Sequence, residues 1–345
     1  MNFDPAQWPL WAHVVLFGAA TAVVAVFGAR LSRLADQLAD MTGMGEALMG
    51  GIFLGASTSL SGLTAAAVAA ADGYPQLSLS NAIGGIAAQM VMLTIADIAY
   101  TRANLEHAAA SPESLMQGCL QTIMLGLVLF IMLAPAVSFL GVNMLTPLLP
   151  IAYAAGMFMV RKSLQRPMWS PRKTDETRTD QPQEQQEGGR GQLVVWVDFL
   201  LSALAVMAAG WGLTRAAERI ATDTFLSQSL VGGLFVAVST SFAELVTSVA
   251  AVRRGALTLA VSGILGGNAF DVLFVAVSDV FYREGSIYQA VSYRERSLLA
   301  LTVVMTGVLL LGLLKRDERG FARIGFESIS IIFIYLAGIV LLSVG

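Results

Sequence analysis

Long apolar segments alternate with short polar segments along the whole chain. Most apolar runs hold about 20 residues, enough for a helix to cross the roughly 30 Å hydrocarbon core of a membrane. Inside the runs, apolar and polar residues do not alternate one by one, as they would in the strands of a membrane barrel. The pattern therefore predicts about ten transmembrane helices, with approximate ranges 10–29, 48–71, 80–100, 113–134, 143–160, 193–214, 228–252, 257–281, 297–314 and 324–344.

The composition agrees with an all-α integral membrane protein. Of the 345 residues, 56% are hydrophobic and only 13% are charged, whereas a soluble domain carries about 25% charged residues. The single cysteine, Cys119, excludes a disulfide framework and a metal site built from several thiolates. Any metal site must therefore be built from other ligand types.

A polar segment at 161–192 divides the apolar runs into two groups of five. It is rich in Gln, Glu, Arg and Pro, a composition that cannot bury enough apolar surface to fold alone. We interpret it as a flexible linker between a first half, 1–160, and a second half, 193–345; a regulatory ion-binding segment is the alternative. Lys and Arg concentrate in the linker and in the loops on its side of the membrane, which predicts a cytoplasmic linker and both termini outside.

Residues 51–100 recur at 233–282, 182 positions later and without a gap. Ser57–Ser59 returns as Ser239–Ser241, and the pair Gly84-Gly85 returns as Gly266-Gly267. Because each half has an odd number of spans, the two copies are expected to be inverted with respect to each other across the membrane. Transporters built from inverted repeats place their substrate site between the repeats, near the bilayer midplane.

The two copies differ at acidic positions. Glu244 of the second copy corresponds to Gly62, and Asp271 corresponds to Gln89. An ionised carboxylate at the bilayer centre costs at least about 2.5 kcal/mol, and no Lys or Arg lies in the central part of any predicted span. The counter-charge is therefore expected to be a mobile cation or a proton, the alternative being a protonated, hydrogen-bonded structural glutamate.

Hard cations take carboxylate, hydroxyl, amide and carbonyl oxygens as ligands. The repeats offer such a set: Glu244, Asp271, Thr240, Ser241, Thr58, Ser59, Gln89 and Asn268. Two carboxylates balance one divalent cation, two monovalent cations or two protons. The glycine pairs allow either unwinding, which frees carbonyl ligands, or close helix packing.

Asp97 and Asp279 also recur, near the ends of their predicted spans. We expect them to anchor the helices at the membrane interface, paired with Arg102 and Arg283. A second ion site or a proton relay is the alternative.

The repeat motifs resemble those of the cation/calcium exchanger superfamily, which includes the sodium/calcium exchangers. Residues 237–244 and 262–271 are similar to the two family stretches G-x-x-x-T-S-x-x-E and G-N-x-x-G-S-N-x-x-[ND], and residues 55–62 and 80–89 are a degraded copy. The resemblance implies exchange of calcium for sodium or protons, with ligands at Thr58, Ser59, Gln89, Thr240, Ser241, Glu244 and Asp271. A calcium site that lacks a carboxylate at Gly62 should bind calcium more weakly or accept another ion.

We therefore expect a secondary active cation antiporter that uses alternating access at a midplane site. A monovalent-cation/proton exchanger, an exchanger of another divalent cation and a non-transporting sensor are the alternatives. No enzyme is indicated, because no G-x-S-x-G or Walker motif occurs and both histidines lie near span ends. The expected partners are inorganic cations and the lipid bilayer of a cell membrane, by preference a bacterial inner membrane, with no cofactor, no nucleic acid and the oligomeric state open.

Overall fold

The computed structural model describes residues 8–42, 55–100, 103–109, 111–165, 168, 170–172, 174, 191–254, 257–317 and 325–343. The first half contains α1 (Leu10–Thr42), α3 (Gly55–Thr58), α4 (Leu60–Ala71), α5 (Pro75–Ala99), α6 (Leu105–Ala108), α7 (Pro112–Leu133), the strands β1 (Ser138–Phe139) and β2 (Val142–Asn143), and α8 (Leu148–Gln165). The second half contains α9 (Gln192–Asp223), α10 (Gln228–Leu230), the π-helical turn η3 (Val231–Val236), α11 (Ala237–Thr240), α12 (Phe242–Arg254), α13 (Leu257–Asp271), α14 (Leu273–Phe281), α15 (Ile287–Ala290), α16 (Tyr293–Lys315) and α17 (Phe326–Ser343).

The all-α membrane architecture is confirmed, and a helix lies in each of the ten predicted ranges. Among the described residues, six helices are long and apolar enough to cross a membrane, and a bent helix pair makes a seventh. Leu60–Ala71 and Phe326–Val340 are shorter apolar helices. A total of ten spans is consistent with this set. The division into halves at the 161–192 linker stays a prediction.

Several predicted boundaries are wrong in a systematic way. Helix α1 continues to Thr42 and α9 to Asp223, well past the ends predicted from hydropathy. The reason is that polar residues outside the hydrocarbon core can continue the same helix. Arg30 at the polar end of α1 forms an ion pair of 3.1 Å with Asp198 of α9. Conversely, the second, seventh and eighth predicted spans are each broken inside the apolar stretch.

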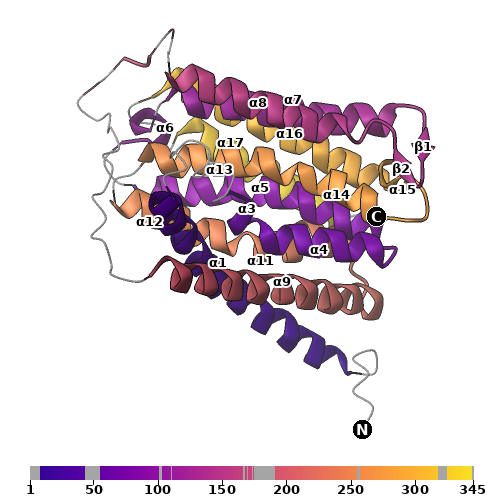
Figure 1. Ribbon diagram of the computed structural model, residues 1–345. Coiled ribbons are helices and arrows are strands. Elements are labelled where there is room, and N and C mark those ends of the chain that lie inside the picture. The colour runs from indigo at the N-terminus through magenta and orange to yellow at the C-terminus, as the bar shows by residue number, and fades with distance from the viewer. Residues whose placement is uncertain are drawn as a thin grey trace.

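Helix α5 is the centre of the bundle. Its most apolar window is 89% buried, against 17% for α1, because α4, η3, α13, α16 and α17 all contact it. Figure 1 shows α1 and α9 together along one side of this core, where α1 packs mainly on α9 and α12, and α9 mainly on α1 and α4. The fold thus has a packed core and a peripheral helix pair.

The two copies of the repeat run in opposite directions. In Figure 1 the chain passes from α3 to α4 from left to right, whereas it passes from α11 to α12 from right to left. The start of α1 and the end of α17 lie at the right of the view, and the end of α8 and the start of α9 lie at the left. This is the inverted arrangement that the odd number of spans per half predicts.

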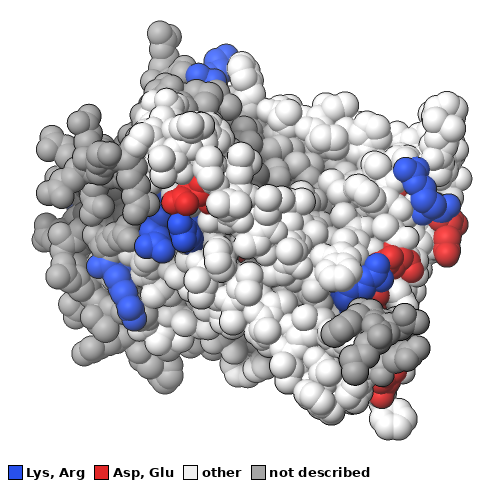
Figure 2. All heavy atoms as spheres, turned by 60° about the horizontal axis from the view of Figure 1, so that its bottom comes forward, with Lys and Arg blue, Asp and Glu red and all other residues white. Residues whose placement is uncertain are grey.

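Charged side chains collect at two ends of the molecule. Figure 2 shows Lys, Arg, Asp and Glu at opposite sides of the view, with an uncharged band between them. Large apolar side chains of the outer helices are exposed in the described residues, among them Val15, Phe158, Leu201, Leu311 and Phe333. An exposed apolar belt between charged rims is the surface of a multi-pass membrane protein.

Asp97 and Asp279 do not form the expected pairs with arginine. The Asp97 carboxylate accepts the backbone N–H of Leu105 at 2.7 Å, and that of Asp279 accepts the N–H of Ile287 at 3.1 Å. Each bond reaches eight residues ahead to the first residue of a short helix, α6 or α15. No ion pair joins Asp279 to Arg283 in the described part of the chain, and Arg102 lies outside it. The two aspartates therefore cap matching turns.

Glu106 gives a testable pH dependence at the turn that Asp97 caps. It lies in α6, between the spans, and burial, reinforced by the Asp97 and Glu327 carboxylates, raises its pKa well above 4.5. The folded protein then holds a proton that the unfolded chain releases, so stability falls as pH rises from about 4.5 through the raised pKa. We expect Glu106→Gln, which mimics the protonated form, to melt as wild type at pH 4.5 and several degrees higher at pH 8, in thermal unfolding of the detergent-solubilised protein.

The exposed Glu284 supplies the matched control. Glu284→Gln should leave the melting temperature within about a degree of wild type at both pH values, because an exposed substitution changes stability little. Equal melting curves for wild type and Glu106→Gln over the whole range would contradict the assignment.

Candidate functional site

Two helix breaks lie at matching positions of the repeats. The first, at Ser59 between α3 and α4, has φ −83° and ψ 2°. The second, at Ser241 between α11 and α12, has φ −86° and ψ 5°. The helices around the second break are inclined by 44° to each other. Both breaks lie within the hydroxyl-rich stretch of the repeat, whose serine and threonine side chains are buried inside the bundle.

A small polar cavity lies between the breaks, and we call it the interrepeat cavity. Its lining comes from both repeats: Ser59, Gly62, Asn81, Ala82, Gly85, Gln89, Thr240, Ser241, Glu244, Asp271 and Phe274. Its volume is about 10 Å³, room for about one water molecule or an ion of similar size.

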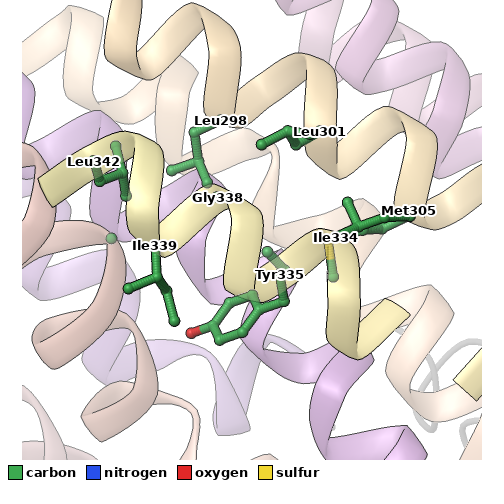
Figure 3. Close-up of a pocket in the computed structure, with 10 residues that line it drawn as sticks. Leu298, Leu301, Met305, Ile334, Tyr335, Gly338, Ile339 and Leu342 are labelled. Carbon is green, nitrogen blue, oxygen red and sulfur yellow. The ribbon is translucent and has the colours of Figure 1, made fainter. Parts of the chain in front are cut away.

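A second cavity among the described residues is apolar. It lies against α16 and α17, where Leu298, Leu301, Met305, Ile334, Tyr335, Gly338, Ile339 and Leu342 point into it (Figure 3). Its only polar side chain is Tyr335, and it contains no charged residue. It therefore offers no ligands for a cation, and the interrepeat cavity is the candidate site.

Glu244 enters the interrepeat cavity from the first turn of α12. The hydroxyl of Ser59, from the opposite repeat, donates to Glu244 Oε1 at 3.4 Å. Glu244 Oε2 is buried and has no hydrogen-bond partner within the described chain. The N-terminal end of a helix favours a carboxylate through the helix dipole, so the break at Ser241 places Glu244 on the cavity wall at the end of α12 where that dipole acts in favour of its charge.

Asp271 enters from the end of α13, immediately before the break at Val272. Its Oδ2 accepts a hydrogen bond from Gln89 Nε2 at 2.7 Å, across 182 positions of sequence. That separation equals the offset of the repeat, so each residue is the counterpart of the other. Such a pair can meet only near the pseudo-two-fold axis that relates the repeats. Asp271 and Gln89 therefore lie near this axis.

Three buried oxygens of the cavity lack a donor among the described residues: Glu244 Oε2, Asp271 Oδ1 and Gln89 Oε1. Native proteins rarely leave such atoms without a water, a proton or an ion. None of the ion pairs that the structure describes involves Glu244 or Asp271. The arrangement thus combines two carboxylates with oxygen ligands, a chemistry suited to a hard cation.

The structure brings six of the eight predicted ligands to the cavity wall: Ser59, Gln89, Thr240, Ser241, Glu244 and Asp271. Thr58 and Asn268 do not line it. Asn268 lies one turn before Asp271 on α13, is fully buried, and has no hydrogen-bond partner for either amide atom in the part described. No group of three or more His, Cys, Asp or Glu side chains suited to a metal occurs in the described residues, so a cation here depends on neutral oxygens as well.

The glycine pairs do not unwind their helices. Helix α5 continues through Gly84 and Gly85, and α13 continues through Gly266 and Gly267. A Cβ atom at Gly84 would lie 2.4 Å from the carbonyl oxygen of Gly233, so Gly84 serves close packing of α5 against η3. Of the two alternatives for the glycine pairs, the structure has close packing at Gly84 and unwinding at neither pair; the helices break at Ser59, Ser241 and Val272 instead.

Sequence reasoning missed the lining residues Asn81, Ala82 and Phe274. Asn81 links the repeats, because its amide donates to the carbonyl of Gly62 at 3.0 Å and accepts from Thr240 Oγ1 at 3.4 Å. An asparagine inside an apolar run was an available signal. Phe274 had none, because an aromatic residue in an apolar helix is expected to pack in the core. In the structure it faces Gly62 across the cavity.

Comparison with known proteins matches the chain to one family. The profile of the family described as "Sodium/calcium exchanger protein" matches residues 12–160 and 194–344. The sodium/calcium exchanger MaX1 of Methanosarcina acetivorans is 28% identical over 160 residues, 46% of this chain and 43% of MaX1. The inner membrane protein YrbG of Escherichia coli is 27% identical over 124 residues, 36% of this chain and 37% of YrbG. The matched segments thus span about two fifths of these relatives.

The fold is shared with a solved exchanger. The crystal structure of the H⁺/Ca²⁺ exchanger CAX superposes with a TM-score of 0.70, over 98% of this chain and 83% of CAX, at 12% sequence identity. At this identity the likeness concerns the fold alone. It covers both repeats and the peripheral helices.

Proposed function

Because the chain belongs to the sodium/calcium exchanger family, we propose that it is a secondary active cation antiporter whose site is the interrepeat cavity. Glu244 and Asp271 would supply the charge, and Ser59, Gln89, Thr240 and Ser241 would supply neutral oxygens. The observation that carries the proposal is the set of three buried, unpartnered oxygens from both repeats around a space of ionic size.

The proposed mechanism is alternating access. The cavity lies between two broken helices of opposite direction, so movement of either broken helix would open it toward one side of the membrane. The peripheral pair α1 and α9 contacts α12 and α4, which carry these breaks, and is the element suited to move with them. A bound cation would neutralise the two carboxylates while the protein changes from one open state to the other. A second ion, or protons, would neutralise them during the reverse change.

The proposed cargo is calcium exchanged for sodium or protons. Two carboxylates balance one calcium ion, and the coupling ions must supply equal charge when the site carries no calcium. We place the protein in a cell membrane, a bacterial inner membrane by preference, with the termini outside and the 161–192 linker in the cytoplasm. The excess of Lys and Arg in and beside the linker supports this orientation.

Counter-transport by the purified protein tests the proposal. In proteoliposomes loaded with sodium, or made acidic inside, we expect the outward sodium or proton gradient to drive calcium uptake against the calcium gradient. Dissipating the driving gradient with an ionophore should stop the uptake. Absence of coupled flux for every cation tested, from a protein that remains folded in the vesicles, would contradict antiport.

A second candidate is a monovalent-cation/proton exchanger, or an exchanger of another divalent cation, with the same fold. The observation that favours it is Gly62, which gives the first repeat no carboxylate where the second has Glu244. Calcium affinity rises with the number of ligand charges. The same vesicles, screened with sodium, potassium, lithium, magnesium and manganese, distinguish the two candidate functions. Flux of a monovalent cation that external calcium does not affect supports the second candidate. Binding without any flux supports a sensor.

A further inference from the structure

The first repeat's missing side chain leaves a place in the interrepeat cavity that another residue fills. A Cβ atom built at Gly62 would lie 2.9 Å from Cε2 of Phe274 and 3.7 Å from Cζ of the same ring. Ring carbons at such distances leave no room for the side chain that Glu244 has at the matching position. The edge of the Phe274 ring therefore stands where a side chain of the first repeat would enter.

The ring is held firmly in this position. Phe274 is 4% exposed and makes a T-shaped contact with Phe270, with ring centroids 6.2 Å apart. Phe270 in turn makes a T-shaped contact with Tyr153 of α8, at 5.8 Å. Such aromatic pairs add to the stability given by burial alone. A close-packed aromatic row does not rotate aside for a new neighbour without cost.

The matching position of the first repeat carries Met92, 182 residues before Phe274. Methionine is flexible and unbranched, and it adapts to irregular space. The two repeats thus differ together at two positions: one repeat has glutamate and phenylalanine, the other glycine and methionine. Because Phe274 lies against Gly62, the larger side chain of one repeat stands where the other repeat has lost both a side chain and a charge.

We propose that Phe274 is a specificity-determining residue of the cation site. Its ring occupies the place of a third carboxylate, limits the site to the charge of Glu244 and Asp271, and closes the first-repeat side of the cavity to water. The role rests on the proposed function, since it concerns the cation of that site. It predicts that a carboxylate at position 62 is accepted only after the ring is replaced by a flexible side chain.

The test is equilibrium binding of calcium alone to the purified, full-length protein, with Gly62→Glu, Phe274→Met and the double variant beside wild type. Isothermal titration gives the affinity, and the size-exclusion profile reports folding. We expect Gly62→Glu to bind calcium no more tightly than wild type and to lose thermal stability. The double variant should bind calcium at least tenfold more tightly than Phe274→Met, because a third carboxylate raises calcium affinity.

A second measurement remains readable whether or not the wild-type site binds calcium. Gly62→Ala should lower the melting temperature when Phe274 is present. In the Phe274→Met background, the same substitution should lower it by no more than half as much. Equal losses in both backgrounds would overturn the steric role of the ring. A folded double variant that binds calcium no better than Phe274→Met would overturn the role in specificity. Binding by the double variant alone would support the inference while it contradicts calcium transport by the wild type.

Discussion

Glu244→Gln and Asp271→Asn are each expected to reduce cation counter-transport in proteoliposomes about 30-fold or more. Each substitution removes a buried charge from the interrepeat cavity but keeps the size of the side chain. Removing the charge of one partner of a buried charge pair costs about 2–5 kcal/mol. Here each carboxylate is one partner and the bound cation is the other. The measurement is initial uptake driven by an imposed gradient, at equal amounts of reconstituted protein.

The control for this experiment is Asp223→Asn at the exposed end of α9, which also removes one negative charge. We expect it to retain wild-type flux. If both site variants transport at the wild-type rate, neither carboxylate binds the cation. If only one of them does, the cation is bound by the other carboxylate with neutral oxygens.

Gly84→Ala should have the second large effect, this time on folding. The added methyl group would lie 2.4 Å from the carbonyl oxygen and 2.6 Å from Cα of Gly233, which are backbone atoms of η3. Separating α5 from η3 disturbs the most buried helix of the bundle, and overpacking of this kind costs about 1–3 kcal/mol. We expect a lower yield of monodisperse protein and a melting temperature reduced by several degrees.

The next residue provides a matched control within the same motif. A Cβ atom at Gly85 would have Ser241 Oγ as its nearest neighbour, at 3.8 Å, an ordinary contact. Gly85→Ala should therefore melt within a degree or two of wild type. Equal destabilisation by the two alanines would mean that general crowding around α5, and not the contact with Gly233, determines the result, since alanine itself favours the helix over glycine.

The architecture could be predicted from the sequence because the two strongest signals act over long stretches. Apolar runs of membrane length identify the helices, and an unbroken repeat with an odd number of spans per half predicts the inversion. Helix ends were predicted less well. Arg30 ends the apolar run, but it continues α1 as helix and pairs with Asp198, so loss of hydropathy does not mark the end of a helix.

Most of the polar residues that line the interrepeat cavity could be singled out from the sequence, whereas the helix breaks that shape the cavity could not. Buried polar residues such as Gln89 and Asp271 are conspicuous in an apolar run because each has a cost in the membrane. The helix breaks at Ser59 and Ser241 carry no comparable signal, since serine is common in regular membrane helices, whereas the glycine pairs drew attention and remain helical. The role of Phe274 depends on its contact with Gly62 of the other repeat. The sequence around Phe274 does not predict that contact.

The contact between Gln89 and Asp271 has a consequence for how such a molecule can diverge from a perfect duplicate. On a two-fold axis, identical copies bring every axial side chain against its own twin. Two aspartates at 2.7 Å would both accept and neither would donate unless they shared a proton, whereas glutamine and aspartate give one donor and one acceptor. A symmetric pair of ionised aspartates is therefore costly on the axis, and the glutamine removes that cost. A single substitution there gives the two halves unequal charge, and with it a direction that the duplicated scaffold by itself does not possess.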